Sequence, residues 1–214
     1  MAKTATIDLE QVPAKSAEAL LNATSALMSE RNSVNVTFSD ISQRSGLNSA
    51  LIRYHFGSKA GLFKALLERD AGGTFGELER LVVADMSAVQ KLRHHIHGVI
   101  KVYYRYPYMN RLVGALSMDS DSDTARFISE RFTKPLAEAQ RAILQQGERE
   151  GVFRVVDPML FYFSTIGACD HLFHARHSLR YAFDVDDIDD ALRRRFADHI
   201  CDLLLRSVMQ RPER

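Results

Sequence analysis

Apolar side chains recur every three to four residues along most of this chain, and this period restricts its fold more than any other feature. Residues 14–30 place one apolar stripe on a helix, formed by Leu20, Leu21, Thr24, Leu27 and Met28. Two later stretches repeat the pattern, with Leu62, Phe63, Leu66 and Leu67 in one and Leu192, Phe196, Ile200, Leu203 and Leu204 in the other. Strand-like alternation is scarce. The sequence therefore predicts an all-α fold of about nine helices.

The composition excludes several protein classes. With 214 residues, 46% hydrophobic and 26% charged, the chain can form one large or two small globular domains. Only Cys169 and Cys201 are present, without a CxxC motif, which excludes a disulfide scaffold and a cysteine zinc site. The N-terminus lacks the apolar core of a signal peptide, and no apolar run approaches the roughly 18 residues of a membrane span. We expect a soluble cytoplasmic protein without membrane partners.

Charge alone does not indicate a nucleic-acid partner. The net charge is +1, so any site for a polyanion must be a local patch. Residues 1–60 are also nearly balanced, with Lys3, Lys15, Arg31, Arg44, Arg53 and Lys59 against Asp8, Glu10, Glu18, Glu30 and Asp40.

Helix boundary signals are dense between residues 37 and 63. Thr37 and Asp40 have the spacing of a capping box, which starts a helix over residues 38–45 that Gly46 closes. Asn48 can cap the next helix, of about seven residues. Gly57 ends that short helix, and Ser58 caps a longer one. Helix, glycine turn and short helix form the helix-turn-helix pattern, although any helical protein can contain such a pair.

In a helix-turn-helix the second helix enters the major groove of DNA, and its first residues meet base edges. Small side chains allow close approach there, and arginine, tyrosine and histidine can donate to phosphates or bases. We expect the DNA contacts at Thr37, Ser39, Asn48, Ser49, Ala50, Arg53, Tyr54, His55 and Lys59. Phe38, Ile41, Leu47, Leu51 or Ile52, Phe56 and Phe63 would form the core behind them.

The stretch TFSDISQRSGLNSALIRYHFGSKAGLFKALL, residues 37–67, resembles the DNA-binding domain of TetR-family transcriptional regulators. The resemblance rests on Thr37, on Ile41 with Ser42, on Gly46, and on the sequence HFGSKAGLF. It implies an N-terminal DNA-binding domain and a C-terminal helical domain that binds a ligand and forms a homodimer. Arg53 departs from the pattern, since the family usually has a tyrosine there that contacts the DNA backbone. Arg53 could contact a phosphate or read a base, and both roles stay open.

The glycines Gly72, Gly73 and Gly76 indicate a boundary between residues 1–70, the DNA-binding domain, and residues 71–214. They are either a break in the helix or a soft joint. Beyond them we expect helices near 86–105, 107–118, 122–150, 157–178 and 187–209, with a kink or split at Pro135. Residues 145–163, QQGEREGVFRVVDPMLFYF, weakly resemble the link before the last helices of the family's ligand domain.

Two features of the second domain suggest its contacts. Four tyrosines lie between residues 103 and 108, and the helix near 157–178 is apolar nearly all round, as expected for a helix buried on every side. We expect the ligand at Tyr103, Tyr106, Leu116, Phe127, Phe163, Gly167, Asp170 and His171. The last two long helices would form the dimer bundle, through Phe161, Ala168, Phe173, Phe196, Ile200, Leu203 and Leu204.

Catalytic and metal-binding signals are weak. Asp119, Asp121, Asp123 and Glu130 are spaced as in a calcium loop, but Thr124 stands where that loop needs glycine, so we expect a helix N-terminus. Two groups of three histidines, at 94–97 and 171–177, lack further ligands for a metal. No P-loop or nucleophile elbow occurs. We expect no enzyme activity, metal or cofactor.

These features together predict a homodimeric regulator that binds an operator in double-stranded DNA and represses transcription until an unidentified small molecule releases it. Two alternatives stay open: a DNA-binding regulator controlled by a protein partner, and a helical enzyme with a dispersed site.

Overall fold

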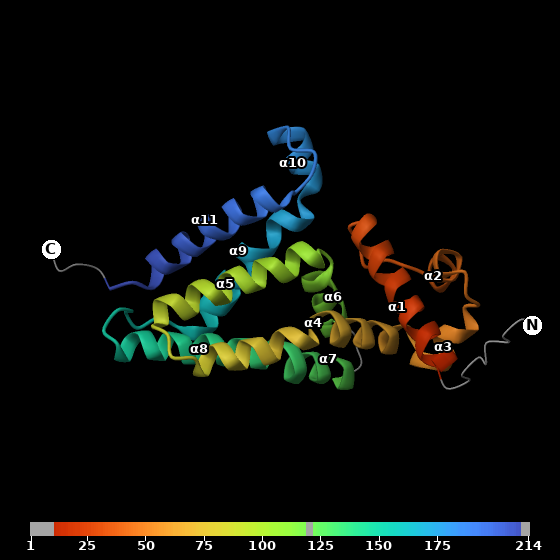
Figure 1. The fold of residues 1–214 in the computed structure, drawn as a ribbon, viewed down its shortest axis with the longest axis horizontal. Coiled ribbons are helices and arrows are strands. Elements are labelled where there is room, and N and C mark those ends of the chain that lie inside the picture. The colour runs from red at the N-terminus through yellow and green to blue at the C-terminus, as the bar shows by residue number, and fades with distance from the viewer. Residues whose placement is uncertain (1–10, 119–121, 211–214) are drawn as a thin grey trace, which may run out of the picture. The chain divides into compact units, whose positions relative to one another are not determined.

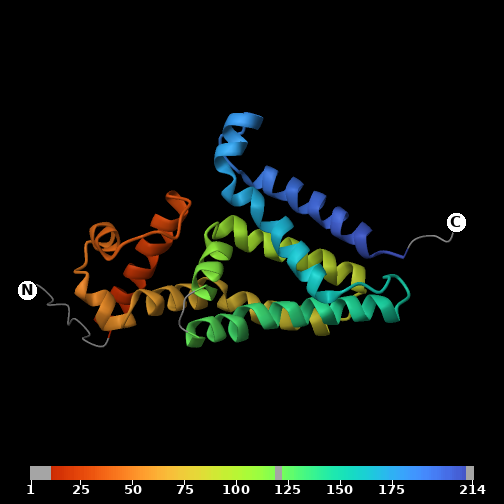
Figure 2. The same cartoon turned by 180° about the vertical axis from the view of Figure 1, so that it is seen from behind.

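The computed structural model describes residues 11–118 and 122–210 of the chain, and Figures 1 and 2 show it from opposite sides. The predicted all-α fold is confirmed. Within the described residues the α-helices run from α1 to α11, two more than expected, and one π-helical segment lies between α7 and α8. None of these helices is long and apolar enough to cross a membrane.

The chain forms two compact units, residues 1–70 and residues 71–214. The boundary lies within helix α4, Lys59–Val83, which continues without interruption through Gly72, Gly73 and Gly76. The glycine cluster is therefore not a break. Its role as a soft joint stays a prediction.

The N-terminal unit contains α1 (Gln11–Glu30), α2 (Phe38–Ser45), α3 (Ala50–Phe56) and the first turns of α4. Helix α1 packs against both α2 and α3. Residues with no exposed surface lie on all four helices, among them Leu20, Met28, Ile41, Ile52, Leu62 and Leu66. Ile52, rather than Leu51, is thus the α3 residue that enters this core.

Seven α-helices follow α4 in the C-terminal unit, together with the π-helical segment Ser129–Thr133. The α-helices are α5 (Ala88–Arg105), α6 (Met109–Ser117), α7 (Ser122–Ile128), α8 (Lys134–Arg149), α9 (Pro158–His174), α10 (Arg176–Phe183) and α11 (Asp190–Val208). Helix α5 is central, because it packs against α6, α8, α9 and α11. In both views α11 runs alongside α5.

Two expected helices are split. The helix predicted over 122–150 becomes α7, the π-helical segment and α8, with Pro135 in the first turn of α8, so the predicted effect of Pro135 is confirmed. The prediction of one helix over 157–178 is wrong, since the chain turns at Ala175 and starts α10. None of the eight described residues of α10 is buried.

The acidic stretch before α7 is described only in part. Asp123 lies in the first turn of α7, as expected for a carboxylate at a helix N-terminus. Asp119 and Asp121 lie outside the described residues.

Candidate nucleic-acid interface and ligand cavity

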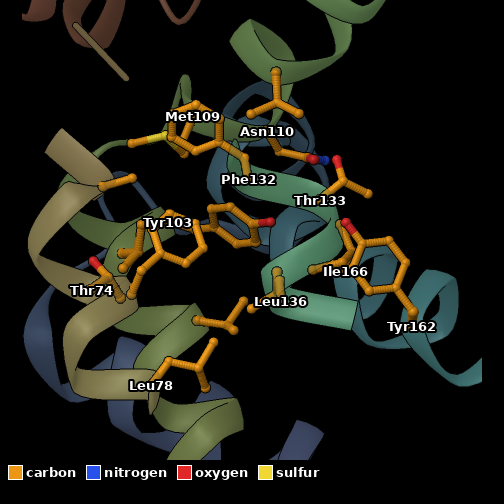
Figure 3. A pocket seen from close by; sticks show the side chains of 15 residues that line it. Thr74, Leu78, Tyr103, Met109, Asn110, Phe132, Thr133, Leu136, Tyr162 and Ile166 are labelled. Carbon is orange, nitrogen blue, oxygen red and sulfur yellow. The ribbon is translucent and has the colours of Figure 1, made fainter. Parts of the chain in front are cut away.

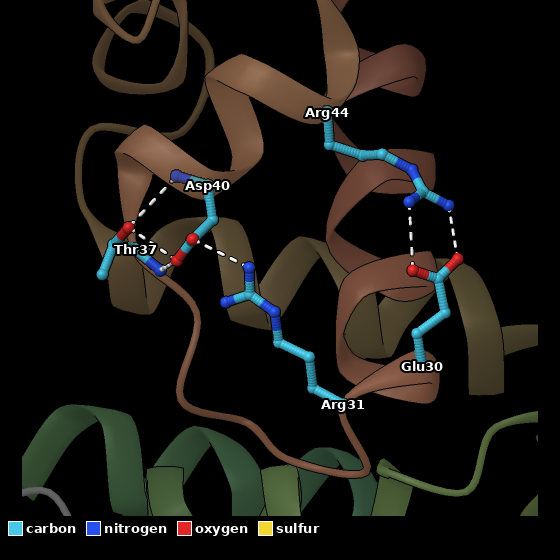
Figure 4. A network of polar contacts seen from close by, with 5 residues as sticks. All are labelled: Glu30, Arg31, Thr37, Asp40 and Arg44. Atoms are coloured by element: carbon cyan, nitrogen blue, oxygen red, sulfur yellow. Dashed lines mark hydrogen bonds and ion pairs between the residues drawn. The ribbon is translucent and has the colours of Figure 1, made fainter.

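Helix α2 begins with the predicted capping box (Figure 4). The Thr37 hydroxyl accepts a hydrogen bond from the Asp40 backbone N–H at 3.1 Å, and Asp40 Oδ2 accepts from the Thr37 N–H at 2.8 Å. Arg31, just after α1, donates to Asp40 Oδ1 at 2.8 Å. This hydrogen bond, followed by those from Thr37, holds the pKa of Asp40 well below its usual range. The start of α2 is thereby tied to the end of α1.

A second ion pair joins α1 to the last turn of α2 (Figure 4). Both terminal nitrogens of Arg44 donate to the carboxylate of Glu30, one of them at 3.0 Å. Glu30 and Asp40 are therefore each compensated by an arginine of their own unit. Exposed pairs of this kind add little stability, but they neutralise the two carboxylates nearest to α2.

The turn between α2 and α3 has the predicted geometry. Gly46 has φ +71°, in the left-handed region, and its N–H donates to the Ser42 carbonyl at 3.0 Å. The Ser42 hydroxyl donates to the Leu47 carbonyl at 2.6 Å, which closes the turn from the other side. Asn48 Oδ1 accepts from the Ala50 N–H at 2.8 Å, so Asn48 satisfies the first N–H of α3 from one residue before the N-cap position, Ser49, whose own side chain makes no capping bond.

Helix α3 presents one polar face to solvent while Ile52 faces inward. Arg53 is exposed and Tyr54 is 73% exposed; Asn48 and Ala50 are exposed at the start of the helix. Ser49 is half-buried. Across the described residues, no carboxylate lies within ion-pair distance of Arg53. The side chains at the N-terminal end of this face are small, and one turn later it carries Arg53, which has no ion-pair partner among the described residues.

Some of the expected DNA contacts already have partners within their own unit. The Thr37 hydroxyl donates to Asp40 at 2.7 Å, so Thr37 serves the cap. His55 Nε2 forms a 2.7 Å hydrogen bond with Ser16 Oγ on α1, so His55 positions α3 instead of standing free at its surface. Lys59 Nζ lies 5.4 Å from the centre of the Phe63 ring, yet the residue is exposed and its charge stays available.

The C-terminal unit contains a cavity of about 100 Å³ among α4, α5, α6, the π-helical segment, α8 and α9 (Figure 3). Its walls are mostly aliphatic and aromatic. The lining residues are Ala71, Thr74, Phe75, Leu78, Val99, Val102, Tyr103, Met109, Asn110, Val113, Phe132, Thr133, Leu136, Tyr162 and Ile166. A concave apolar site with a few polar groups is the usual form of a small-molecule site.

The polar groups of this cavity are hydroxyls and one amide. Burial raises the pKa of Tyr103 well above its ordinary value, so its hydroxyl keeps its proton. Burial also raises the pKa of Tyr162, which is hydrogen-bonded to Thr133. Asn110 Nδ2 donates to Asp170 Oδ2 at 3.0 Å, which fixes the orientation of its amide.

Of the expected ligand residues, only Tyr103 lines this cavity. Phe163, Gly167 and His171 are exposed, because the cavity side of α9 is formed by Tyr162 and Ile166. One residue along an α-helix corresponds to about 100° of rotation, which turns the expected stripe away from the cavity. The other expected residues lie outside the lining: Tyr106 is half-buried, Leu116 and Asp170 are buried, and Phe127 packs against Phe132.

The wall formed by α4 was not predicted from the sequence. Ala71, Thr74, Phe75 and Leu78 lie on one side of the helix and line the cavity. Their spacing of three to four residues was visible in the sequence. The glycines between these residues indicated a possible break in the helix instead.

Four of the expected dimer residues do not lie on the surface of the single chain. Phe161, Phe173, Ile200 and Leu204 are buried within the C-terminal unit itself. Leu203 is 53% exposed, and Ala168 and Phe196 line a separate groove between α9, α10 and α11. The exposed apolar residues of α9 are Met159, Leu160 and Phe163, and Phe163 is 65% exposed.

Comparison with known proteins agrees with this architecture. Residues 20–66 match the family of bacterial regulatory proteins named tetR, and residues 85–213 match the tetracyclin repressor-like C-terminal domain. No curated protein matches the chain.

Solved structures of regulators share the fold over nearly the whole chain. A putative transcriptional regulator from Saccharomonospora viridis, in complex with choline, is 17% identical, with a TM-score of 0.68 over 92% of this chain and 100% of its own. A TetR-family regulator from Agrobacterium tumefaciens is 19% identical, with a TM-score of 0.66 over 92% and 100%. The regulator FadR from Bacillus subtilis, in complex with stearoyl-CoA, is 17% identical, with a TM-score of 0.65 over 88% and 97%. The chain belongs to the tetR family of bacterial regulatory proteins, which are DNA-binding regulators of transcription.

Proposed function

We propose that this protein is a ligand-responsive repressor: a homodimer that holds an operator until a small molecule enters its cavity. Residues 1–70 would bind DNA, and residues 71–214 would bind the ligand and dimerise. Because its target would be double-stranded DNA in a bacterial cell, it would work in the cytoplasm. The observation that carries this proposal is the exposed polar face of α3, in a unit where Glu30 and Asp40 are each paired with an arginine.

The DNA-binding part of the proposal rests on charge and shape. Glu30 and Asp40 are paired with Arg44 and Arg31, so they add little negative potential near α3. Arg53 is exposed on this face and has no ion-pair partner among the described residues. Ala50 and Ser49 allow the start of α3 to approach base edges, while Tyr54 can donate to a phosphate.

The ligand part of the proposal rests on the cavity. The two DNA-binding units of the dimer would have different spacings in different conformations. A ligand that binds one conformation more tightly than another shifts the population toward the spacing of that conformation. Operator half-sites about 34 Å apart, or a multiple of that, are matched by only one spacing. Four cavity-lining residues belong to α4, the helix that also contributes Leu62 and Leu66 to the DNA-binding core. Movement of α4 on ligand binding would therefore alter the DNA-binding unit.

Dimerisation would use the outer surface of α9 and α11. Leu160 and Phe163 on α9 and Leu203 on α11 are large apolar side chains exposed in a single chain. Burial of such residues against a second copy would remove them from water, and a two-fold axis would bring each patch onto itself.

The cavity counts against regulation by a protein partner alone, because a partner that binds a surface needs no internal space. A helical enzyme is the other alternative, and the family's DNA-binding motif counts against it.

Selection from a library of random DNA duplexes tests the proposal directly. The full-length protein should enrich a two-fold symmetric sequence at low ionic strength, and fluorescence anisotropy should then measure tight binding of that sequence. Failure to retain any duplex in 50 mM salt would overturn the proposal.

A further inference from the structure

We propose that the cavity selects a small, neutral, mainly apolar molecule with one hydrogen-bond donor, and rejects carboxylates and quaternary ammonium ions. This inference rests on the proposed function, because it names the chemical class of the ligand for the same cavity.

The lining offers no counter-charge to an ion. Among the described residues that line the cavity, none is Asp, Glu, Lys, Arg or His. An ion moved from water into such a site would be buried without a partner, which is strongly unfavourable. A neutral molecule loses little by the same transfer and gains contact with the aromatic and aliphatic walls.

The polar groups of the lining can accept a hydrogen bond from a ligand, since the hydroxyls of Thr74 and Tyr103 accept as well as donate. Tyr162 and Thr133 are already bonded to each other. The Nδ2 group of Asn110 donates to Asp170, which leaves the carbonyl oxygen of Asn110 as the acceptor of that amide. Asp170 is thus a positioning residue. Because it accepts from the Nδ2 group, the amide of Asn110 presents its acceptor, Oδ1, to a ligand rather than its donor.

Asp170 is a buried acidic residue that contacts the lining through Asn110. His174 Nδ1 lies 3.1 Å from its Oδ2. Burial lowers the pKa of Arg111, and the negative charge of Asp170 acts in the opposite direction. The two side chains therefore interact electrostatically. Asp170 Oδ1 nevertheless has no hydrogen-bond partner among the residues that the structure describes. A cation that reached this oxygen is therefore the alternative that the experiment must exclude.

The size of the cavity limits the ligand. Its volume is about 100 Å³, whereas an apolar cavity of roughly 150 Å³ holds a benzene molecule. A single-ring or short-chain molecule fits with a modest movement of the walls. A long acyl chain does not.

A series of probes with one aromatic ring separates these possibilities. Benzyl alcohol is neutral and donates a hydrogen bond, toluene has no donor, benzoate is an anion and benzyltrimethylammonium is a cation. Calorimetric titration of the full-length protein should rank benzyl alcohol first, with the two ions weaker by at least about tenfold. Tighter binding of benzoate or of the ammonium ion than of benzyl alcohol would overturn the proposal. If the ammonium ion binds most tightly, we would infer that it binds at Asp170. Absence of binding by all four would also overturn it.

The role of the Asn110 acceptor is tested by N110L. This variant should bring the affinity for benzyl alcohol down to that for toluene, without improving the binding of either ion. Because N110L also removes a partner of Asp170, its thermal unfolding is measured beside that of wild type. If the variant does not fold, the wild-type preference for benzyl alcohol over toluene decides the same point. Equal wild-type affinities for these two probes would mean that Asn110 accepts no hydrogen bond from the ligand.

DNA release separates this inference from the proposed function. If benzyl alcohol binds but leaves the DNA complex intact, the ligand class stands and release by ligands of this class fails. If DNA is released by benzoate or by the ammonium ion, regulation by a ligand stands and the inferred class fails.

Discussion

Gly61, in the first turn of α4, lies against the carbonyl oxygen of Phe56, the last residue of α3. A Cβ atom at residue 61 would lie 2.0 Å from that oxygen. The contact is with backbone, so no rotation of a side chain can relieve it. Gly61 therefore sets how closely α4 follows α3, and with it the position of the exposed face of α3.

Replacement of Gly61 should disturb both stability and DNA binding. We expect G61A to lower the free energy of unfolding by about 1–3 kcal/mol, because the backbone must shift to admit the methyl group. Operator affinity should fall as well, since α3 moves with it. The control is G72A, where a Cβ meets nothing within 4 Å, and where alanine should stabilise the helix by about 1 kcal/mol. Urea denaturation and anisotropy measure the two effects, and unchanged behaviour of G61A would contradict this geometry.

The soft-joint hypothesis for α4 predicts that stiffening Gly72 and Gly73 uncouples ligand from DNA. A Cβ at either residue has open space around it, so the double variant G72A/G73A should fold normally with a more rigid helix. We expect a higher concentration of ligand to be needed for DNA release. If release and DNA affinity both match wild type, the glycines are not a joint.

Arg53 should contribute to operator binding through its unpaired guanidinium. R53A is expected to weaken binding, and the salt dependence shows which contact is lost. A slope of log affinity against log salt that is smaller by about 0.9, with unchanged sequence preference, assigns Arg53 to a phosphate. Relaxed preference at one base assigns it to readout. R149A, at the exposed end of α8, is the matched control, and equal behaviour of the two variants would exclude Arg53 from the interface.

The proposed dimer surface is tested by one charge. F163D places a carboxylate on a side chain that is 65% exposed in the single chain, so its fold should survive while the dimer dissociates. Sedimentation velocity should show monomers and operator affinity should fall. V155D makes the same change at a side chain that is 80% exposed outside the helices and should stay dimeric. A dimeric F163D would place the interface elsewhere.

His95 should make the protein less stable in mild acid. It is buried, its Nε2 lies 3.0 Å from Gln140 Nε2, and burial lowers its pKa from 6.5 to about 4. Between these values the unfolded chain binds a proton that the folded chain does not, so stability falls as the pH falls through this window. The full effect is about 3 kcal/mol.

H95Q should reduce this pH dependence while keeping a partner for Gln140. The control is H94Q, the exposed neighbour on α5, which should leave the dependence unchanged. Denaturation midpoints at pH 4.5, 5.5 and 7 give the comparison. A wild-type slope in H95Q would mean that the buried imidazole is not its source.

The boundaries of the DNA-binding motif could be predicted because they depend on neighbours in sequence. Thr37 with Asp40, Gly46 and Asn48 each satisfy or release backbone groups within a few residues. The ion pairs of Glu30 and Asp40 join residues of different elements. The sequence alone therefore did not show that Arg31 and Arg44 are paired while Arg53 is exposed.

The C-terminal contacts could not be predicted for a different reason. Helix α9 is apolar on nearly every side, so its pattern does not tell the Tyr162 side from the Phe163 side. The turn at Ala175 carries no glycine or proline. The position of this turn depends on packing between elements that are distant in sequence, and no local sequence pattern indicates it.

The continuity of α4 has a consequence for variation in such regulators. A substitution between residues 68 and 77 changes one side chain, but an inserted or deleted residue would rotate everything beyond it by about 100° about the helix axis. The length of this segment is therefore fixed more strictly than its chemistry. A chimera that borrows a sensing domain should be joined in register within the helix, with the number of residues preserved.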